Sequence, residues 1–131
     1  MQRANLETIM AVIDTIKALG KPHPFSKNEI LLNNSSFVEL MFVHGTLQIS
    51  SIESFRPGGG RAAMQTILEV ADRFDVPCRL NPIPYGKSYL NKRQLTAWYS
   101  RLGFTKIYTN TMERPSITTT EKITHEFGIL V

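Results

Sequence analysis

The sequence is organised around the stretch FRPGGGRAAM, residues 55–64. The residues before it, 46–55, alternate apolar and polar side chains as a half-buried β-strand does. The residues after it, 62–74, carry apolar side chains at helical spacing. Three consecutive glycines, Gly58, Gly59 and Gly60, therefore connect the end of a predicted strand to the start of a predicted helix.

This arrangement suits a phosphate-containing ligand. The first turn of a helix has backbone N–H groups without partners inside the helix, and the positive end of the helix dipole lies there. Glycines let a ligand approach the backbone closely, and Arg56 and Arg61 add positive charge on either side. A Gly-Gly-Gly run is equally typical of a plain loop, so this stretch alone leaves both interpretations open.

Length and composition indicate one globular domain. The chain has 131 residues, of which 42% are hydrophobic and 20% charged, enough to bury a core. Its net charge of +4 favours anionic ligands, but the basic residues form no run that would single out nucleic acid. The single cysteine, Cys78, excludes an internal disulfide and indicates a small buried hydrophobe. Neither a signal peptide nor a membrane-spanning apolar run is found, so we expect a cytoplasmic protein without a membrane partner.

The rest of the sequence predicts further helices and strands of one α/β domain. Apolar periodicity, capping residues and Gly or Pro breakers set their limits. Because a helix follows the 46–55 strand, the next strand is expected to run parallel to it. The threonine-rich tail, 116–131, is expected to form an edge strand or to contact a second copy of the chain in a homodimer. The predicted elements are a helix over 5–19, a capping box at 26–29 before the apolar stretch 30–32, a strand over 37–43 covered on both faces, a turn at His44-Gly45 into the 46–55 strand, a helix over 62–74, a strand over 78–80, a helix from 88 or 91 to 102, and a final strand or hairpin over 104–112.

Several known motifs fail on the sequence. Gly86-Lys87-Ser88 stands where a Walker-type loop could lie, but Asn81 replaces the required glycine and two prolines remove N–H groups. The glycine turn also fails as a dinucleotide-binding fingerprint, because the acidic residue expected at the end of the next strand is missing from residues 78–81. There is no helical His/carboxylate pair for a metal and no Gly-x-Ser-x-Gly nucleophile elbow. Trp98, which shares a helical face with leucines, is interpreted as a core residue rather than a base-stacking one.

Residues 58–64, GGGRAAM, and residues 95–104, LTAWYSRLGF, carry a family likeness. The first resembles the pyrophosphate loop, and the second the aromatic-Tyr to Leu-Gly-Phe signature, of the GNAT superfamily of acetyl-coenzyme A-dependent N-acetyltransferases. The ending Met-Glu-Arg-Pro at 112–115 is similar to that of some short bacterial and phage members. The likeness covers roughly 46–115. It departs at Phe55, where the family usually has Arg or Gln, and at Lys92, where it often has Asn.

The resemblance implies a fold and a cosubstrate. The fold would be a single GNAT-like α/β domain: a mixed, mostly antiparallel sheet flanked by helices, with a parallel strand pair splayed into a cofactor cleft. Residues 1–45 would form an N-terminal helix and hairpin, 46–115 the acetyl-coenzyme A-binding core and 116–131 a tail. Acetyl-coenzyme A would be the cosubstrate, without a metal, and the acceptor a primary amine of unknown type. The implied cofactor-binding residues are Ile52, Ser54, Arg56, Gly58, Gly59, Gly60, Arg61 and Asn91.

Two residues are implied in catalysis by direct transfer. Glu53 would take a proton from the incoming ammonium, itself or through water, although a solvated strand glutamate is an equally good interpretation. Tyr99 would protonate the departing thiolate as general acid, against the alternative of a core tyrosine. Two other functions stay open: a GNAT-fold binding or regulatory protein without turnover, and a basic nucleic-acid-binding domain.

Overall fold

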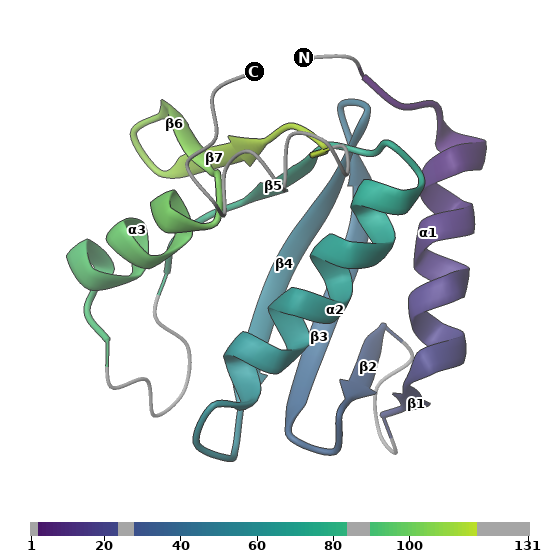
Figure 1. Cartoon of the computed structure of the whole chain (residues 1–131), viewed down its shortest axis with the longest axis horizontal. Helices are drawn as coiled ribbons and strands as arrows, with labels where there is room; N and C mark the ends of the chain where they lie inside the picture. The colour runs from purple at the N-terminus through teal and green to yellow at the C-terminus, as the bar shows by residue number, and fades with distance from the viewer. Residues whose placement is uncertain (1–2, 24–27, 84–89, 118–131) are drawn as a thin grey trace, which may run out of the picture.

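The computed structural model describes residues 3–23, 28–83 and 90–117, which form one seven-stranded sheet with three helices (Figure 1). The strand order is β1-β2-β3-β4-β5-β7-β6. The β4–β5 pair is parallel and all the other pairs are antiparallel, which confirms the predicted fold class. The elements are α1 (Leu6–Leu19), β1 (Lys21–Pro22), β2 (Glu29–Leu32), β3 (Ser36–Val43), β4 (Thr46–Ser54), α2 (Gly59–Arg73), β5 (Cys78–Leu80), α3 (Lys92–Arg101), β6 (Thr105–Tyr108) and β7 (Thr111–Arg114).

Helices α1 and α2 pack side by side on one face of the sheet (Figure 1). The side chain of Asn5 caps α1 by accepting a hydrogen bond of 2.8 Å from the N–H of Thr8. Apolar side chains at helical spacing on both helices meet those of the sheet in one core, and each fully buried one contributes roughly 1.5–3 kcal/mol. The largest fully buried side chains include Phe104, Ile9, Ile16, Leu32, Leu47, Met64, Ile67 and Leu80.

The parallel pair is short, and this shortness creates the site. Strand β5 pairs with β4 only from Leu47 opposite Cys78 to Ile49 opposite Leu80. Beyond Ile49, β4 continues to Ser54, and among the described strands residues 51–54 pair only with β3. A β-bulge lies at the same point, because Glu39 and Leu40 of β3 stand opposite residues 51 and 49 and leave one extra residue, Ser50, on β4. The two parallel strands therefore separate beyond residues 49 and 80.

Residues 30–32 need a correction: they are part of a strand, not a short apolar stretch after a helix cap. Strand β2 pairs with β3 in register from Glu29 opposite Glu39 to Leu32 opposite Ser36. Its side chains alternate between half-buried and buried, and Ile30 and Leu32 reach the core. A strand of four residues gains its stability from pairing with its neighbour, here β3 across a short turn, which the apolar pattern of residues 30–32 alone does not reveal.

The expected burial of residues 37–43 on both faces is wrong for the end of β3. Met41 and Phe42 are 47% and 40% exposed on opposite faces of the strand, whereas Val38 is fully buried. Helices α1 and α2 cover one face of this sheet only, so the other face of β3 stays open in the described part of the chain. The hairpin turn itself is as predicted, with His44 at φ 49° and Gly45 at φ 74°.

The last part of the described chain forms a hairpin, β6–β7, as one of the two predicted alternatives had it. Arg114 at its end is buried and holds α2 and α3 together. Its guanidinium binds Asp72 of α2 through two hydrogen bonds of 2.7 and 2.9 Å, and its Nε donates to the carbonyl oxygen of Leu102 at 2.8 Å. The predictions for Gly86-Lys87-Ser88 and for the tail beyond residue 117 lie outside the described residues.

Candidate active site

A cavity of about 650 Å³ opens where β4 and β5 separate. One wall is the free half of β4, which runs without interruption into the glycine turn and the start of α2. The opposite wall is the end of β5 together with α3. The lining residues are Ile49, Ser50, Ser51, Ile52, Glu53, Ser54, Phe55, Arg56, Pro57, Gly58, Gly60, Arg61, Leu80, Asn81, Ile83, Leu90, Leu95, Trp98 and Tyr99.

The glycine turn leaves backbone donors at this cavity. Gly58 has the left-handed φ of +75° and is the N-cap of α2, a conformation that favours glycine. The first helical hydrogen bond joins the N–H of Ala62 to the carbonyl oxygen of Gly58 at 3.2 Å. The N–H groups of Gly60 and Arg61 precede it, so helix geometry gives them no partner within α2. A Cβ added at Gly60 would approach only the Cβ of Ser54, at 3.9 Å, so the backbone there is open to a ligand.

Gly59 differs from its two neighbours. It is buried and does not line the cavity, although the sequence groups it with Gly58 and Gly60 as a cofactor-binding residue. A Cβ at Gly59 would lie 2.6 Å from the Oγ of Ser54 and 2.8 Å from the Cβ of Ser35. The missing side chain of Gly59 therefore lets the start of α2 pack directly on the ends of two strands.

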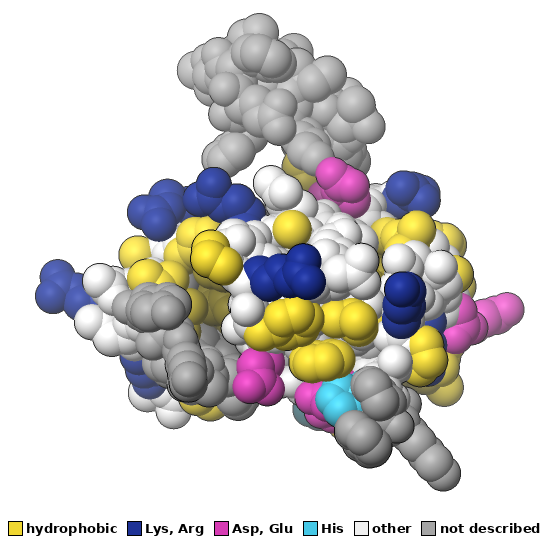
Figure 2. All heavy atoms as spheres, turned by 90° about the horizontal axis from the view of Figure 1, so that it is seen from below, with side chains coloured by type: hydrophobic (Ala, Val, Ile, Leu, Met, Phe, Trp, Pro, Cys, Tyr) yellow, Lys and Arg dark blue, Asp and Glu magenta, His cyan; other side chains and the backbone are white. Residues whose placement is uncertain are grey.

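Three other predicted cofactor-binding residues also line the cavity next to the turn: Ser54, Arg56 and Arg61. The hydroxyl of Ser54 donates to the carbonyl oxygen of Arg56 at 2.8 Å and so helps to shape the turn. The guanidinium of Arg56 lies 5.9 Å from the centre of the Phe55 ring. This end of the molecule faces the viewer in Figure 2, where basic and hydrophobic side chains lie next to one another.

The two predicted catalytic residues lie on facing walls of the same cavity. Glu53 is exposed and comes from the free half of β4, opposite Phe37 of β3. Tyr99 comes from α3 and is half-buried, with its ring 4.9 Å from Trp98 and 5.8 Å from Phe104. The structure thus brings together a carboxylate and a phenol that are far apart in the sequence.

Asn91 is the N-cap of α3 rather than a cavity residue. Its side-chain oxygen accepts from the N–H of Gln94 at 2.9 Å, and the Gln94 side chain accepts from the N–H of Asn91 at 2.9 Å. This reciprocal capping box starts the helix that carries Tyr99. The remaining predicted contact, Ile52, is half-buried and lines the cavity.

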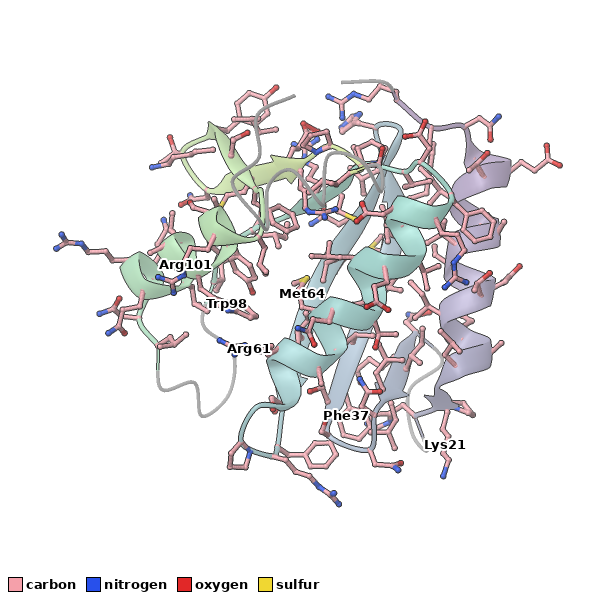
Figure 3. The ribbon with its side chains drawn as sticks, viewed as in Figure 1. Lys21, Phe37, Arg61, Met64, Trp98 and Arg101 are labelled. Carbon is pink, nitrogen blue, oxygen red and sulfur yellow. The ribbon has the colours of Figure 1, made fainter. Side chains whose placement is uncertain are left out.

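Trp98 is the main site residue that sequence reasoning missed. It packs against the core, as predicted, but it also lines the large cavity and a smaller one of about 300 Å³ between α2 and α3. Figure 3 shows Arg61 of α2 extending toward Trp98 and Arg101 of α3. Helical periodicity marks the apolar face of α3, but it does not show that this face borders an opening. The smaller cavity is lined by Arg61, Met64, Gln65, Trp98, Arg101 and Leu102.

Other kinds of site find no support in the described residues. Among residues 3–23, 28–83 and 90–117, no three His, Cys, Asp or Glu side chains gather to hold a metal ion. In the same ranges, no helix is both long enough and apolar enough to span a membrane. Cys78 is fully buried, and burial raises the pKa of its thiol to about 12, so it is the small hydrophobe that the sequence predicts.

Comparison with known proteins supplies the fold family. No protein-family model matches the sequence, and no curated protein matches it significantly. Solved structures do match: the anti-CRISPR protein AcrVA5 has a TM-score of 0.51 and 17% identity, over 61% of this chain and 90% of that one. The ribosomal-protein-S18-alanine N-acetyltransferase from Escherichia coli has a TM-score of 0.50 and 15% identity, over 88% of this chain and 92% of that one. The fold is that of a GNAT-type N-acetyltransferase. At these identities, the comparisons establish the GNAT fold alone.

Proposed function

We propose that this protein is an N-acetyltransferase that moves an acetyl group from acetyl-coenzyme A directly to a primary amine. The observation that carries the proposal is one continuous cavity with the free edge of a splayed strand, bare N–H groups at a helix start, and a tyrosine in its walls. The strand edge would bind the pantetheine arm, the N–H groups would bind the pyrophosphate, and the tyrosine would serve the sulfur of the thioester. The GNAT fold of the two structural neighbours supports the same conclusion at the level of the fold.

The volume and the charge of the cavity support coenzyme A as the ligand. Its volume of about 650 Å³ falls in the range usual for ligand pockets. Residues 51–54 of β4 pair with β3 and with no other strand of the described residues, so their other edge would suit the amide groups of an extended pantetheine arm. The N–H groups of Gly60 and Arg61 suit the pyrophosphate, and the side chains of Arg61 and Arg101 add positive charge beside it.

Tyr99 and Glu53 would handle the two protons of the reaction. Acetyl-coenzyme A supplies an activated thioester, whose carbonyl carbon is attacked by the neutral amine as the C–N bond forms and the C–S bond breaks. Tyr99 would give its phenolic proton to the departing sulfur, and the proton that the attacking nitrogen loses as the amide forms would restore the phenol through water. Glu53 is exposed at the rim of the cavity, so it would take the proton from the ammonium through water.

The proposal is tested by release of free thiol from acetyl-coenzyme A in the presence of an amine panel. The panel includes small polyamines, lysine-containing peptides and peptides with free amino termini. Transfer predicts thiol release that depends on one class of amine, with the acetylated amine found by mass spectrometry. Coenzyme A binding without release for any acceptor would favour the GNAT-fold binding protein. Binding to nucleic acid that weakens steeply with salt, without coenzyme A binding, would favour a nucleic-acid-binding domain.

The side from which the acceptor enters and the oligomeric state are two further proposals. In this proposal the amine would enter from the side of Glu53, which is exposed. A homodimer formed through the tail remains a prediction, since residues 118–131 lie outside the described part. Sedimentation of the full chain and of a chain truncated after Pro115 tests it.

A further inference from the structure

The glycine turn rests on a second turn, the NNSS turn, which consists of residues 33–35 between β2 and β3 and of Ser36, the first residue of β3. We propose that Asn33 and Ser35 of this turn are positioning residues, which fix the bare N–H groups of the glycine turn for the pyrophosphate of coenzyme A. The inference rests on the proposed function and adds residues that no sequence motif marks. None of the four residues of the NNSS turn lines the large cavity, so they would act through the glycine turn alone.

The first contact holds the chain just before the glycines. The N–H of Phe55 donates to the carbonyl oxygen of Ser35 at 3.0 Å. This hydrogen bond extends the β3–β4 pairing by one step beyond Ser36 opposite Ser54. It fixes the direction in which the chain leaves β4.

The second contact lies within the glycine turn itself. A Cβ at Gly59 would lie 2.8 Å from the Cβ and 2.9 Å from the Oγ of Ser35. Gly59 and Ser35, which is 7% exposed, are thus packed with no space between them. Gly60, the next residue, carries one of the bare N–H groups, so a shift of Gly59 would move that group directly.

The third contact lies after the glycines, at Thr66 in the second turn of α2. The side-chain amide of Asn33 donates to the hydroxyl of Thr66 on α2 at 3.3 Å. That hydroxyl in turn donates to the carbonyl oxygen of Ala62 at 3.1 Å. Ala62 is the residue whose N–H makes the first helical bond of α2. Asn33 is therefore linked through Thr66 to Ala62 in the first turn of α2, the turn that carries the bare N–H groups.

The NNSS turn has a defined backbone shape that suits this role. Asn33 and Asn34 both have left-handed φ values, 56° and 52°, which asparagine adopts more readily than most residues. The turn is thus tied to the chain before, at and after the glycines, by one backbone bond, one close packing contact and one side-chain bond. A change in these contacts should alter the binding of the pyrophosphate more than the binding of the pantetheine arm.

The test compares two variants of the same kind at neighbouring positions. Asn33→Gly keeps the left-handed backbone and removes the contact with Thr66. Asn34→Gly makes the same change at the next residue, which is exposed like Asn33 and has a left-handed φ but makes no side-chain hydrogen bond to the described part of α2, so it is the matched control. Ser35→Val is the third variant; it replaces the hydroxyl by two methyl groups, which would press against Gly59. Trp98 is the only tryptophan and lines the cavity, so its fluorescence reports the binding of both coenzyme A and pantetheine, which lacks the pyrophosphate.

We expect Asn33→Gly and Ser35→Val to weaken coenzyme A binding by about 10-fold, as a small displacement of binding groups does, and to leave pantetheine binding within about twofold. Asn34→Gly should bind both ligands as the wild type does. Equal losses for both ligands, or an Asn33→Gly variant that matches Asn34→Gly, would overturn the inference while leaving the proposed function intact. A wild-type protein that does not bind coenzyme A at all would overturn the proposed function and this inference with it.

Discussion

The two halves of strand β4 differ in what surrounds them, and the difference separates stability from function. Residues 47–49 have β3 on one side and β5 on the other, and Leu47 and Ile49 are buried in the core. Residues 51–54 have β3 alone, and their other edge faces the cavity. The bulge at Ser50 marks the boundary. One strand thus packs in the core with its first half and lines the cavity with its second.

The comparison is tested most strongly by truncating one side chain in each half. Leu47→Ala removes a fully buried side chain and should lower the free energy of unfolding by about 2–5 kcal/mol, because it leaves a cavity in the core. Ile52→Ala, in the free half, should cost less than half as much, since Ile52 is only half-buried. Urea unfolding of both variants measures the two values. Equal losses would show that the second half of β4 is as much a part of the core as the first.

The proposed role of Tyr99, on the cavity wall opposite residues 51–54, is tested by Tyr99→Phe. The substitution keeps the ring, with its contacts to Trp98 and Phe104, and removes only the proton donor. If Tyr99 is the general acid, turnover should fall by roughly 10- to 1000-fold. Coenzyme A binding and the melting temperature should hardly change. Full turnover in Tyr99→Phe, with the chemical step shown to limit the rate, would make Tyr99 a packing residue.

A similar contrast between packing and an open surface is found just after β4, between Gly59 and Gly60. Gly59→Ala should destabilise the protein by about 1–3 kcal/mol, since its Cβ would overlap Ser35 and Ser54. Gly60→Ala should be neutral or slightly stabilising, because the space around Gly60 is open and alanine favours a helix. Thermal unfolding of both variants measures the difference. Similar melting temperatures for the two would contradict the separation of a packing glycine from a ligand-facing one.

Local pattern was enough to predict much of this fold. Alternation before residue 55 and helical spacing after residue 62 predicted β4, α2 and the glycine turn between them, and α2 implied the parallel return to β5. Strand pairing and the burial of each sheet face were not predictable in the same way. Residues 30–32 form a strand because β3 accepts them in register, and the exposure of Met41 depends on which face of the sheet the helices cover.

The candidate site was predictable for the residues that carry a motif and less so for the others. The structure places Glu53, Tyr99 and most of the glycine turn at one cavity, as the resemblance implied. The motif could not separate Gly59 from Gly60, because the difference comes from Ser35, which lies far earlier in the sequence. It also could not show that Asn91 caps α3, or that Trp98 borders two cavities while packing on the core.

A smaller effect is expected at Ser36, the first residue of β3, which stands opposite Ser54 at the end of β4. Its hydroxyl is fully buried and has no hydrogen-bond partner among the described residues. An unpaired buried hydroxyl is unfavourable, so Ser36→Ala should leave stability unchanged or raise it by up to about 1 kcal/mol. Chemical unfolding checks this value. A clear loss of stability in Ser36→Ala would mean that the hydroxyl does have a partner in the folded protein.

The central claim is that the open edge and the glycine turn form a coenzyme A site, and the change in melting temperature on adding coenzyme A tests it most directly. The wild-type protein should melt at a higher temperature with coenzyme A, because a ligand that binds only the folded state stabilises it by mass action. Gly60→Asp should melt near the wild-type temperature without ligand and show no shift with it, since it places a carboxylate where the pyrophosphate would bind. An equal shift in wild type and in well-folded Gly60→Asp would contradict the account.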